Sequence, residues 1–136
     1  MVENDPDMHV DRLASALLRF PSGQATFSCA GQLVSYQRMQ MYGTTGRIEA
    51  EIPFNAPSDR ESRIFLDDGS QLGGTAARPI TFPTVDQYRL QGERFADAVY
   101  GVGVVPVSIE DAIKNMAVLD ALFRSAESGK WERPES

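Results

Sequence analysis

The stretch YGTTG, residues 42–46, is the first place where residue type and spacing suggest chemistry. Paired glycines around two small hydroxyl residues are typical of a loop that cradles phosphate. Such a loop needs a following helix, whose N-terminal N–H groups bind the anion. Residues 47–52 instead read RIEAEI and alternate apolar with charged side chains, which predicts a strand. We therefore interpret the glycine pair as a tight turn between two strands.

A second glycine-rich stretch, YGVGVVP at residues 100–106, supplies the first half of a dinucleotide-binding fingerprint. Pro106 stands where the third Gly or Ala of that fingerprint belongs. The stretch also follows a predicted helix, whereas the fingerprint follows a strand. We interpret it as a connection between two helices.

The only histidine, His9, lies two residues before Asp11. On a strand both side chains would share one face, and a carboxylate can orient an imidazole for base catalysis. The simpler interpretation is an exposed pair near the chain terminus. The Asp67-Asp68-Gly69 stretch could open a calcium loop, but Arg78 occupies the position of its final Glu. The sequence therefore predicts no catalytic, cofactor-binding or metal-ligating residue.

Composition narrows the class of protein. The chain has 136 residues, of which 42% are hydrophobic and 24% charged, as in a folded domain. A net charge of −6 without clustered Lys and Arg argues against nucleic acid as a partner. No apolar run approaches the length of a membrane span. The single cysteine, Cys29, lies in an apolar stretch, so its small side chain is expected to be buried. One cysteine cannot form an internal disulfide, and we expect a cytoplasmic protein.

The elements that must position these residues fall into two groups. Period-two alternation and turn signals predict strands in the first part of the chain, and apolar stripes of helical period predict two helices in the second. The first helix is expected to begin at Thr84 and stop at Gly101, with Tyr88, Phe95 and Val99 on its apolar stripe. The second is expected to run from Ser108 to Gly129. The predicted strands cover 9–20, 24–31, 35–43, 47–52 and 62–68, and a PSG turn with a left-handed glycine joins the first two.

Strands followed by helices predict an α+β fold: an antiparallel or mixed sheet with two C-terminal helices packed on one face. Strand 9–20 carries apolar residues on both sides, so the other face is expected to be available for subunit or domain contacts. We predict a single domain over residues 1–136, with frayed tails at 1–6 and 132–136.

Four landmarks, taken together, carry a family resemblance. They are LLRFPSGQATF, YGTTGRIEAEIPFNAP, YRLQGERFADAVYG and VPVSIEDAIKNMAVLDALFRSAESGKW, in that order along the chain. At these spacings they resemble the C-terminal domain of the glucose-fructose oxidoreductase / inositol dehydrogenase (Gfo/Idh/MocA) family over residues 9–132.

The resemblance implies a parent enzyme with an N-terminal Rossmann domain that binds NAD or NADP and transfers hydride to or from a sugar, polyol or related compound. The C-terminal sheet would support the substrate pocket and the contacts of a homo-oligomer, a dimer or tetramer. The family's cofactor and catalytic motifs precede this region, so no such residue is carried over and the isolated domain is not expected to be catalytic. Tyr88 falls where the family often has a tyrosine beside the pocket, which makes it a substrate-adjacent candidate. The alternative is a non-enzymatic binding or assembly module that uses the exposed sheet face.

Overall fold

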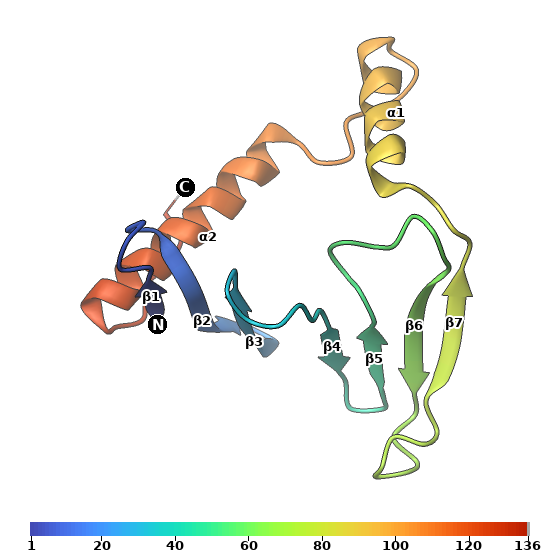
Figure 1. The fold of residues 1–136 in the computed structure, drawn as a ribbon, viewed down its shortest axis with the longest axis horizontal. Helices are drawn as coiled ribbons and strands as arrows, with labels where there is room; N and C mark the ends of the chain where they lie inside the picture. The colour runs from blue at the N-terminus through green and yellow to red at the C-terminus, as the bar shows by residue number, and fades with distance from the viewer. Residues whose placement is uncertain (136) are drawn as a thin grey trace. The chain divides into compact units, whose positions relative to one another are not determined.

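The computed structural model describes residues 1–135, which form two compact units. The first unit combines residues 1–34 with the chain from Val107 onward, and the second comprises Ser35–Pro106. The predicted α+β class, with helices in the C-terminal part, is confirmed (Figure 1). Its strands pair antiparallel in two sheets, one in each unit. The single-domain assignment stays a prediction.

The first unit contains a three-stranded sheet in the order β1-β2-β3. β1 (Val2–Asn4) lies within the stretch that was expected to fray, and pairs with β2 (Asp11–Phe20). β2 continues into β3 (Gly23–Ala30) through a tight turn in which Phe20 pairs with Gly23. The expected left-handed glycine is therefore wrong, because Gly23 already belongs to the strand and the turn is made by Pro21 and Ser22.

The loop between β1 and β2 is organised by one carboxylate. Asp5 is buried, and its Oδ1 accepts the N–H groups of Met8 at 2.9 Å and Asp7 at 3.0 Å. Its Oδ2 accepts the amide of Gln32 at 2.6 Å. These donors, the Met8 N–H first, hold the pKa of Asp5 below its ordinary value because each stabilises the charged form. The loop ends at His9, whose backbone is left-handed, with φ of 57°.

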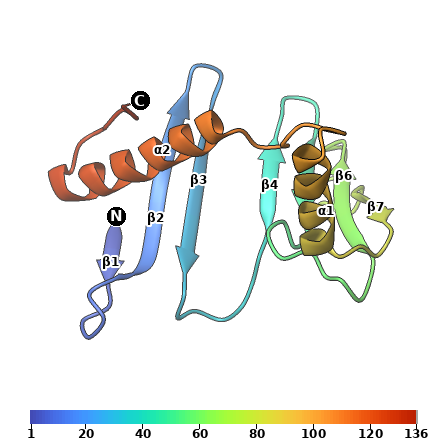
Figure 2. The same cartoon turned by 90° about the horizontal axis from the view of Figure 1, so that it is seen from above.

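Helix α2 (Ile109–Ser128) completes the first unit and crosses β2 and β3 in Figure 2. Both predicted ends are confirmed. The Ser108 hydroxyl accepts the N–H of Asp111 at 3.1 Å, and Gly129 stops the helix with φ of 66°. The residues buried on this helix are Ala117 and Ala121, whereas its larger apolar side chains stay more exposed.

The second unit contains a four-stranded antiparallel sheet in the order β4-β5-β6-β7. Successive side chains alternate between its faces, so one face is largely apolar and the other carries the charges. The sequence of residues 69–79 is consistent with either a loop or an edge strand, and β7 begins at the end of that stretch. The strands are β4 (Met39–Tyr42), β5 (Arg47–Ala50), β6 (Ser62–Asp67) and β7 (Arg78–Phe82).

Helix α1 (Gln87–Val99) follows β7, and it begins later than the sequence predicted. Asp86, not Thr84, is the N-cap, because its carboxylate accepts the N–H groups of Tyr88 and Arg89. A carboxylate placed one residue before the helix satisfies free N–H groups of the first turn, which is the role expected of the Thr84 hydroxyl. The helix ends before Gly101, whose φ is 73°, as predicted.

None of the helices within residues 1–135 has the length and apolar character that a membrane crossing requires.

Candidate functional site

The glycine pair that first suggested phosphate binding forms a turn between β4 and β5. Gly43 donates its N–H to the carbonyl of Gly46 at 2.8 Å, which closes the turn. Gly46 lies so close to β6 that a Cβ built on it would come within 2.5 Å of the Asp67 carbonyl oxygen. The glycine is therefore required by close backbone approach, and the chain continues into a strand that offers no helix N-terminus to an anion.

The 100–106 stretch and the Asp67-Asp68-Gly69 stretch also form local turns rather than binding loops. Val102 and Gly103 donate their N–H groups to the carbonyl of Asp97, which ties the 100–106 stretch to the end of α1. Asp67 accepts the N–H of Gly69 at 2.9 Å, and Asp68 accepts that of Ser70 at 3.0 Å. The Ser70 N–H holds the pKa of Asp68 below its ordinary value. Both carboxylates are thus used within a turn.

His9 and Asp11 do not share a strand face, which corrects the sequence interpretation. β2 begins at Asp11, and the left-handed backbone of His9 places it in the preceding loop. Its N–H donates to the carbonyl of Asp5 at 3.0 Å. Within residues 1–135 no group of three His, Cys, Asp or Glu residues could hold a metal ion.

Tyr88 lies in the first turn of α1, and its side chain is 66% exposed. Its backbone N–H is held by the N-cap carboxylate of Asp86 at 2.9 Å. Two and three turns further along the same face, Phe95 and Val99 are likewise exposed. The predicted apolar stripe therefore exists, but within the described structure it presents a surface with aromatic rings and one phenol hydroxyl.

The structure also brings together charged side chains that lie far apart in the sequence. Alternation along β4, β5, β6 and the residues next to them points these charges to one sheet face, where Arg38 and Arg47 each lie between two carboxylates and Arg63 pairs with one. Arg38 contacts Glu49 at 3.3 Å and Glu51 at 3.4 Å, and Arg63 contacts Glu51 at 2.8 Å. Arg47 completes this charge ladder with Glu49 at 3.3 Å and Asp67 at 3.0 Å. The period-two pattern of RIEAEI was the signal for this face, but it did not identify the partners.

The ladder shifts the ionisation of its members. The hydrogen bond from Arg63 is the main cause that lowers the pKa of Glu51, and the same bond raises the pKa of Arg63. The hydrogen bond to Asp67 raises the pKa of Arg47. Since every arginine of the ladder is paired with a carboxylate of this chain, these charges serve first to hold the sheet in register.

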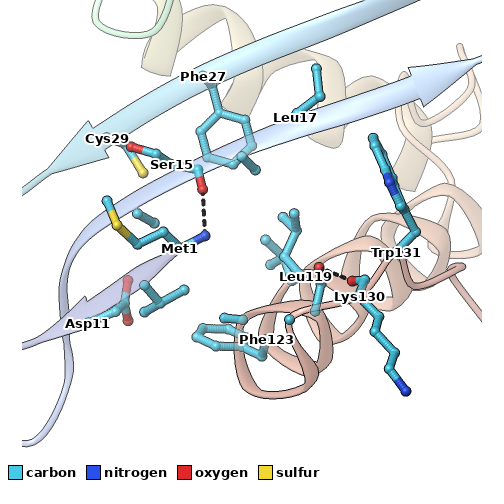
Figure 3. Close-up of a pocket in the computed structure, with 17 residues that line it drawn as sticks. Met1, Asp11, Ser15, Leu17, Phe27, Cys29, Leu119, Phe123, Lys130 and Trp131 are labelled. Atoms are coloured by element: carbon cyan, nitrogen blue, oxygen red, sulfur yellow. Dashed lines mark hydrogen bonds between the residues drawn. The ribbon is translucent and has the colours of Figure 1, made fainter.

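The first unit contains a cavity of about 580 Å³ between its sheet and α2. Figure 3 shows Phe27 of β3 on the sheet side of this space, and Leu119 and Phe123 of α2 on the helix side together with Trp131. Cys29 also lines the cavity and is exposed, which corrects the prediction that it is buried. The physical reason is that the side chains of α2 leave this part of the sheet face uncovered.

Comparison with known proteins decides the family. The model of the oxidoreductase family's C-terminal alpha/beta domain, Gfo/Idh/MocA, matches residues 2–132, almost the whole chain. The chain belongs to this family. The resemblance drawn from the four landmarks of the sequence is thereby confirmed.

Two curated relatives share much of the sequence. An uncharacterized oxidoreductase from Rhizobium meliloti is 43% identical over 129 residues, which are 94% of this chain and 39% of that protein. A D-xylose 1-dehydrogenase (NADP(+)) from Haloferax volcanii is 30% identical over 125 residues, 90% of this chain and 37% of that protein. The chain thus spans less than two fifths of the length of either relative.

A solved structure shares the fold. It is a mutant of a 3-ketoreductase from Actinomadura kijaniata in complex with TDP-benzene and NADP. The TM-score is 0.77 and the sequence identity 20%, over 90% of this chain and 38% of that chain.

Proposed function

We propose that this chain is the C-terminal domain of an NAD(P)-dependent oxidoreductase that acts on a sugar, a polyol or a related compound. The observation that carries the proposal is the family match over residues 2–132, together with similarity to a D-xylose dehydrogenase that uses NADP(+). The complex of the 3-ketoreductase with NADP is consistent with such a cofactor in the family. We place the enzyme in the cytoplasm as part of the proposal.

In this proposal the domain forms one wall of the substrate pocket, and hydride transfer is carried out by the rest of the longer protein. Two observations support this division. The two stretches nearest to a dinucleotide loop, 43–46 and 100–106, are a strand turn and a helix end. The acidic groups of the charge ladder are already bound to arginines, so they are poor candidates for proton transfer at neutral pH.

Titration calorimetry tests this division directly. The chain of residues 1–136 should give no heat of binding with NADH or NADPH, whereas the longer protein should bind at least one of them. Measurable cofactor binding by the chain alone would overturn the assignment of the cofactor site to the rest of the protein.

Tyr88 is the residue of this chain proposed to contact substrate. Its ring and hydroxyl are exposed, so the ring can pack on the apolar face of a sugar while the hydroxyl exchanges hydrogen bonds with the sugar's own hydroxyl groups. Tyr88→Phe in the longer protein removes only the hydroxyl. Tyr100→Phe is a matched control, because Tyr100 lies at the other end of α1 and is also exposed.

The assay is the initial rate of NAD(P) reduction with a panel of aldoses and polyols, D-xylose included. Tyr88→Phe should raise KM several-fold, since one hydrogen bond contributes about 0.5–1.5 kcal/mol, and Tyr100→Phe should leave KM unchanged. Equal KM values for both variants would remove Tyr88 from the pocket. A longer protein that turns over no member of the panel but still assembles would favour the alternative, a non-enzymatic assembly module.

We also propose that the domain forms a homo-oligomer, a dimer or tetramer, through a sheet face. The apolar face of β4–β7 supports this, because Met41 and Ile80 on it are 49% and 43% exposed. Met41→Lys should weaken assembly measured by sedimentation, and Gln40→Lys, which changes the neighbouring position on the charged face, should not. A monomer at high protein concentration would contradict the proposal.

A further inference from the structure

The backbone hydrogen bonds between β1 and β2 extend as far as Met1. Met1 and Ser15 exchange both backbone hydrogen bonds: the Ser15 N–H reaches the Met1 carbonyl at 3.0 Å, and the Met1 amine reaches the Ser15 carbonyl at 2.9 Å. Pairing therefore already reaches Met1, in register with Val2 opposite Ala14. β2, however, runs on to Phe20 with no partner on this side among the described residues.

The unpaired edge has a definite set of donors and acceptors. In an antiparallel ladder, successive residues of a strand present their N–H and C=O groups to alternate sides. Since Ser15 bonds towards β1, the next residues to present their groups on that side are Leu17 and Arg19. Ala16 and Leu18 point the other way, where they pair with Phe27 and Ala25 of β3. An open edge with four such groups is a template for another strand.

The cavity of the first unit lies along this same edge. Its walls include Met1, where β1 ends, and Ala16 and Leu17 of β2. The C-terminal end of α2 and Trp131 form the opposite wall. Figure 3 shows the Met1–Ser15 bond at the border of this space, with Leu17 and Trp131 beyond it. The cavity lies over the side of the sheet that faces α2 and reaches this edge at Met1 and Leu17, so alternate side chains of a longer β1 would point into it.

We propose that the Leu17–Arg19 edge of β2 binds an extended polypeptide segment, antiparallel to β2, that continues the line of β1 in the longer protein. The curated relatives extend far beyond the matched region, which in this family is the C-terminal domain, so a preceding segment is available in proteins of that length. The proposal is independent of the substrate and cofactor assigned above.

The register fixes the side-chain pattern of the segment. Val2 lies opposite Ala14 and lines the cavity with it. Every second residue of the segment, beginning with the one opposite Ala16, shares that face. These residues would meet Phe123 and Trp131, whose side chains are 46% and 62% exposed, and are therefore expected to be apolar. The intervening residues point to the other sheet face.

Short N-terminal extensions of the 136-residue chain test the proposal without altering any of its own residues. The in-register extension is Val-Thr-Val-Thr-Val, placed directly before Met1 so that its valines lie opposite Ala16, Leu18 and Phe20. The shifted control, Thr-Val-Thr-Val-Thr, turns the valines to the other face. In a third version, Val-Thr-Val-Pro-Val, the proline lies opposite Leu17 and cannot donate the hydrogen bond required there.

Amide hydrogen exchange is read at Leu17 and Arg19, with Ala16 and Leu18 as internal references because their groups are bonded to β3. The in-register extension should slow exchange at Leu17 and Arg19 about tenfold relative to the unextended chain, and the proline version should not. Equal exchange at Leu17 in all chains, or equal protection by the proline and in-register extensions, would overturn the proposal. So would protection in the unextended chain that rises with concentration, because a second copy would then occupy the edge.

Discussion

Replacing Gly46 by Ala tests the structural account of the glycine turn most directly. A Cβ on Gly46 would lie 2.5 Å from the carbonyl oxygen of Asp67, which is a backbone atom and cannot rotate away. Relief requires that separation to grow to at least about 3.4 Å, so that β6 must move away from the turn. The movement would disturb two bonds of Asp67, to Arg47 at 3.0 Å and to Gly69 at 2.9 Å.

The cost follows from these contacts. Forcing a methyl group into a packed site costs about 1–3 kcal/mol. Gly43→Ala is the matched control in the same turn, because its Cβ would meet only the Gly46 carbonyl, at 3.4 Å. Neither glycine has a positive φ, so the left-handed penalty is absent from both variants. Gly43→Ala is therefore expected to be neutral, or to stabilise by about 0.4–1 kcal/mol through the entropy of the unfolded chain.

Urea unfolding of the two variants, followed by circular dichroism, gives the comparison. Gly46→Ala should lower the unfolding free energy by about 1–3 kcal/mol with an unchanged m-value. If it unfolds at the same urea concentration as Gly43→Ala, the close approach of the turn to β6 does not constrain residue 46, and the structural reading of the motif is refuted.

Three further predictions concern single groups. Asp67→Asn, which weakens the bond to Arg47 in a site where the Asp67 side chain is 3% exposed, should destabilise by about 1.5–3 kcal/mol in urea unfolding. Gly92→Ala should stabilise by up to about 1 kcal/mol, since its Cβ meets open space in mid-helix, whereas Gly129→Ala should destabilise by about 1 kcal/mol because φ there is 66°. Because folding lowers the pKa of Asp5, its contribution to the unfolding free energy is complete above the ordinary pKa of an aspartate and is lost as pH falls through the folded-state pKa. The unfolding free energy of Asp5→Asn, measured as a function of pH in the acid range, should therefore fall less steeply than that of the unsubstituted chain.

Local rules were sufficient for the 43–46 turn and for three of the four helix ends, but not for the start of α1 or for the turn before Gly23. The absence of a helix after 43–46 predicted a strand turn, and Ser108, Gly101 and Gly129 were identified by their capping chemistry. These features depend on a few adjacent residues, so the sequence contains all the information that they need. Thr84 failed as a cap because a competing carboxylate, Asp86, lies closer to the first turn.

Features that depend on distant residues were not predictable in the same way. Alternation on β5 placed Arg47 and Glu49 on one face, but their partners Arg38 and Asp67 are set by strand register. The candidate Tyr88 was found through the family resemblance, and its exposure is not determined by the helical period. Periodicity states which side chains share a face and says nothing of what covers that face.

On helix α2, the residues buried in the core differ from the residues available to a partner segment. Hydrophobicity ranks Leu119 and Phe123 above Ala117 and Ala121, yet the alanines are the buried pair. Small side chains permit close approach of the helix backbone, and the larger neighbours are then left at the border of the contact. On this helix the larger side chains, Leu119 and Phe123, line the cavity beside the open edge of β2. The residues that a partner segment would meet are therefore the apolar ones that the fold leaves uncovered, and they are recognised only after the small residues have been assigned to the core.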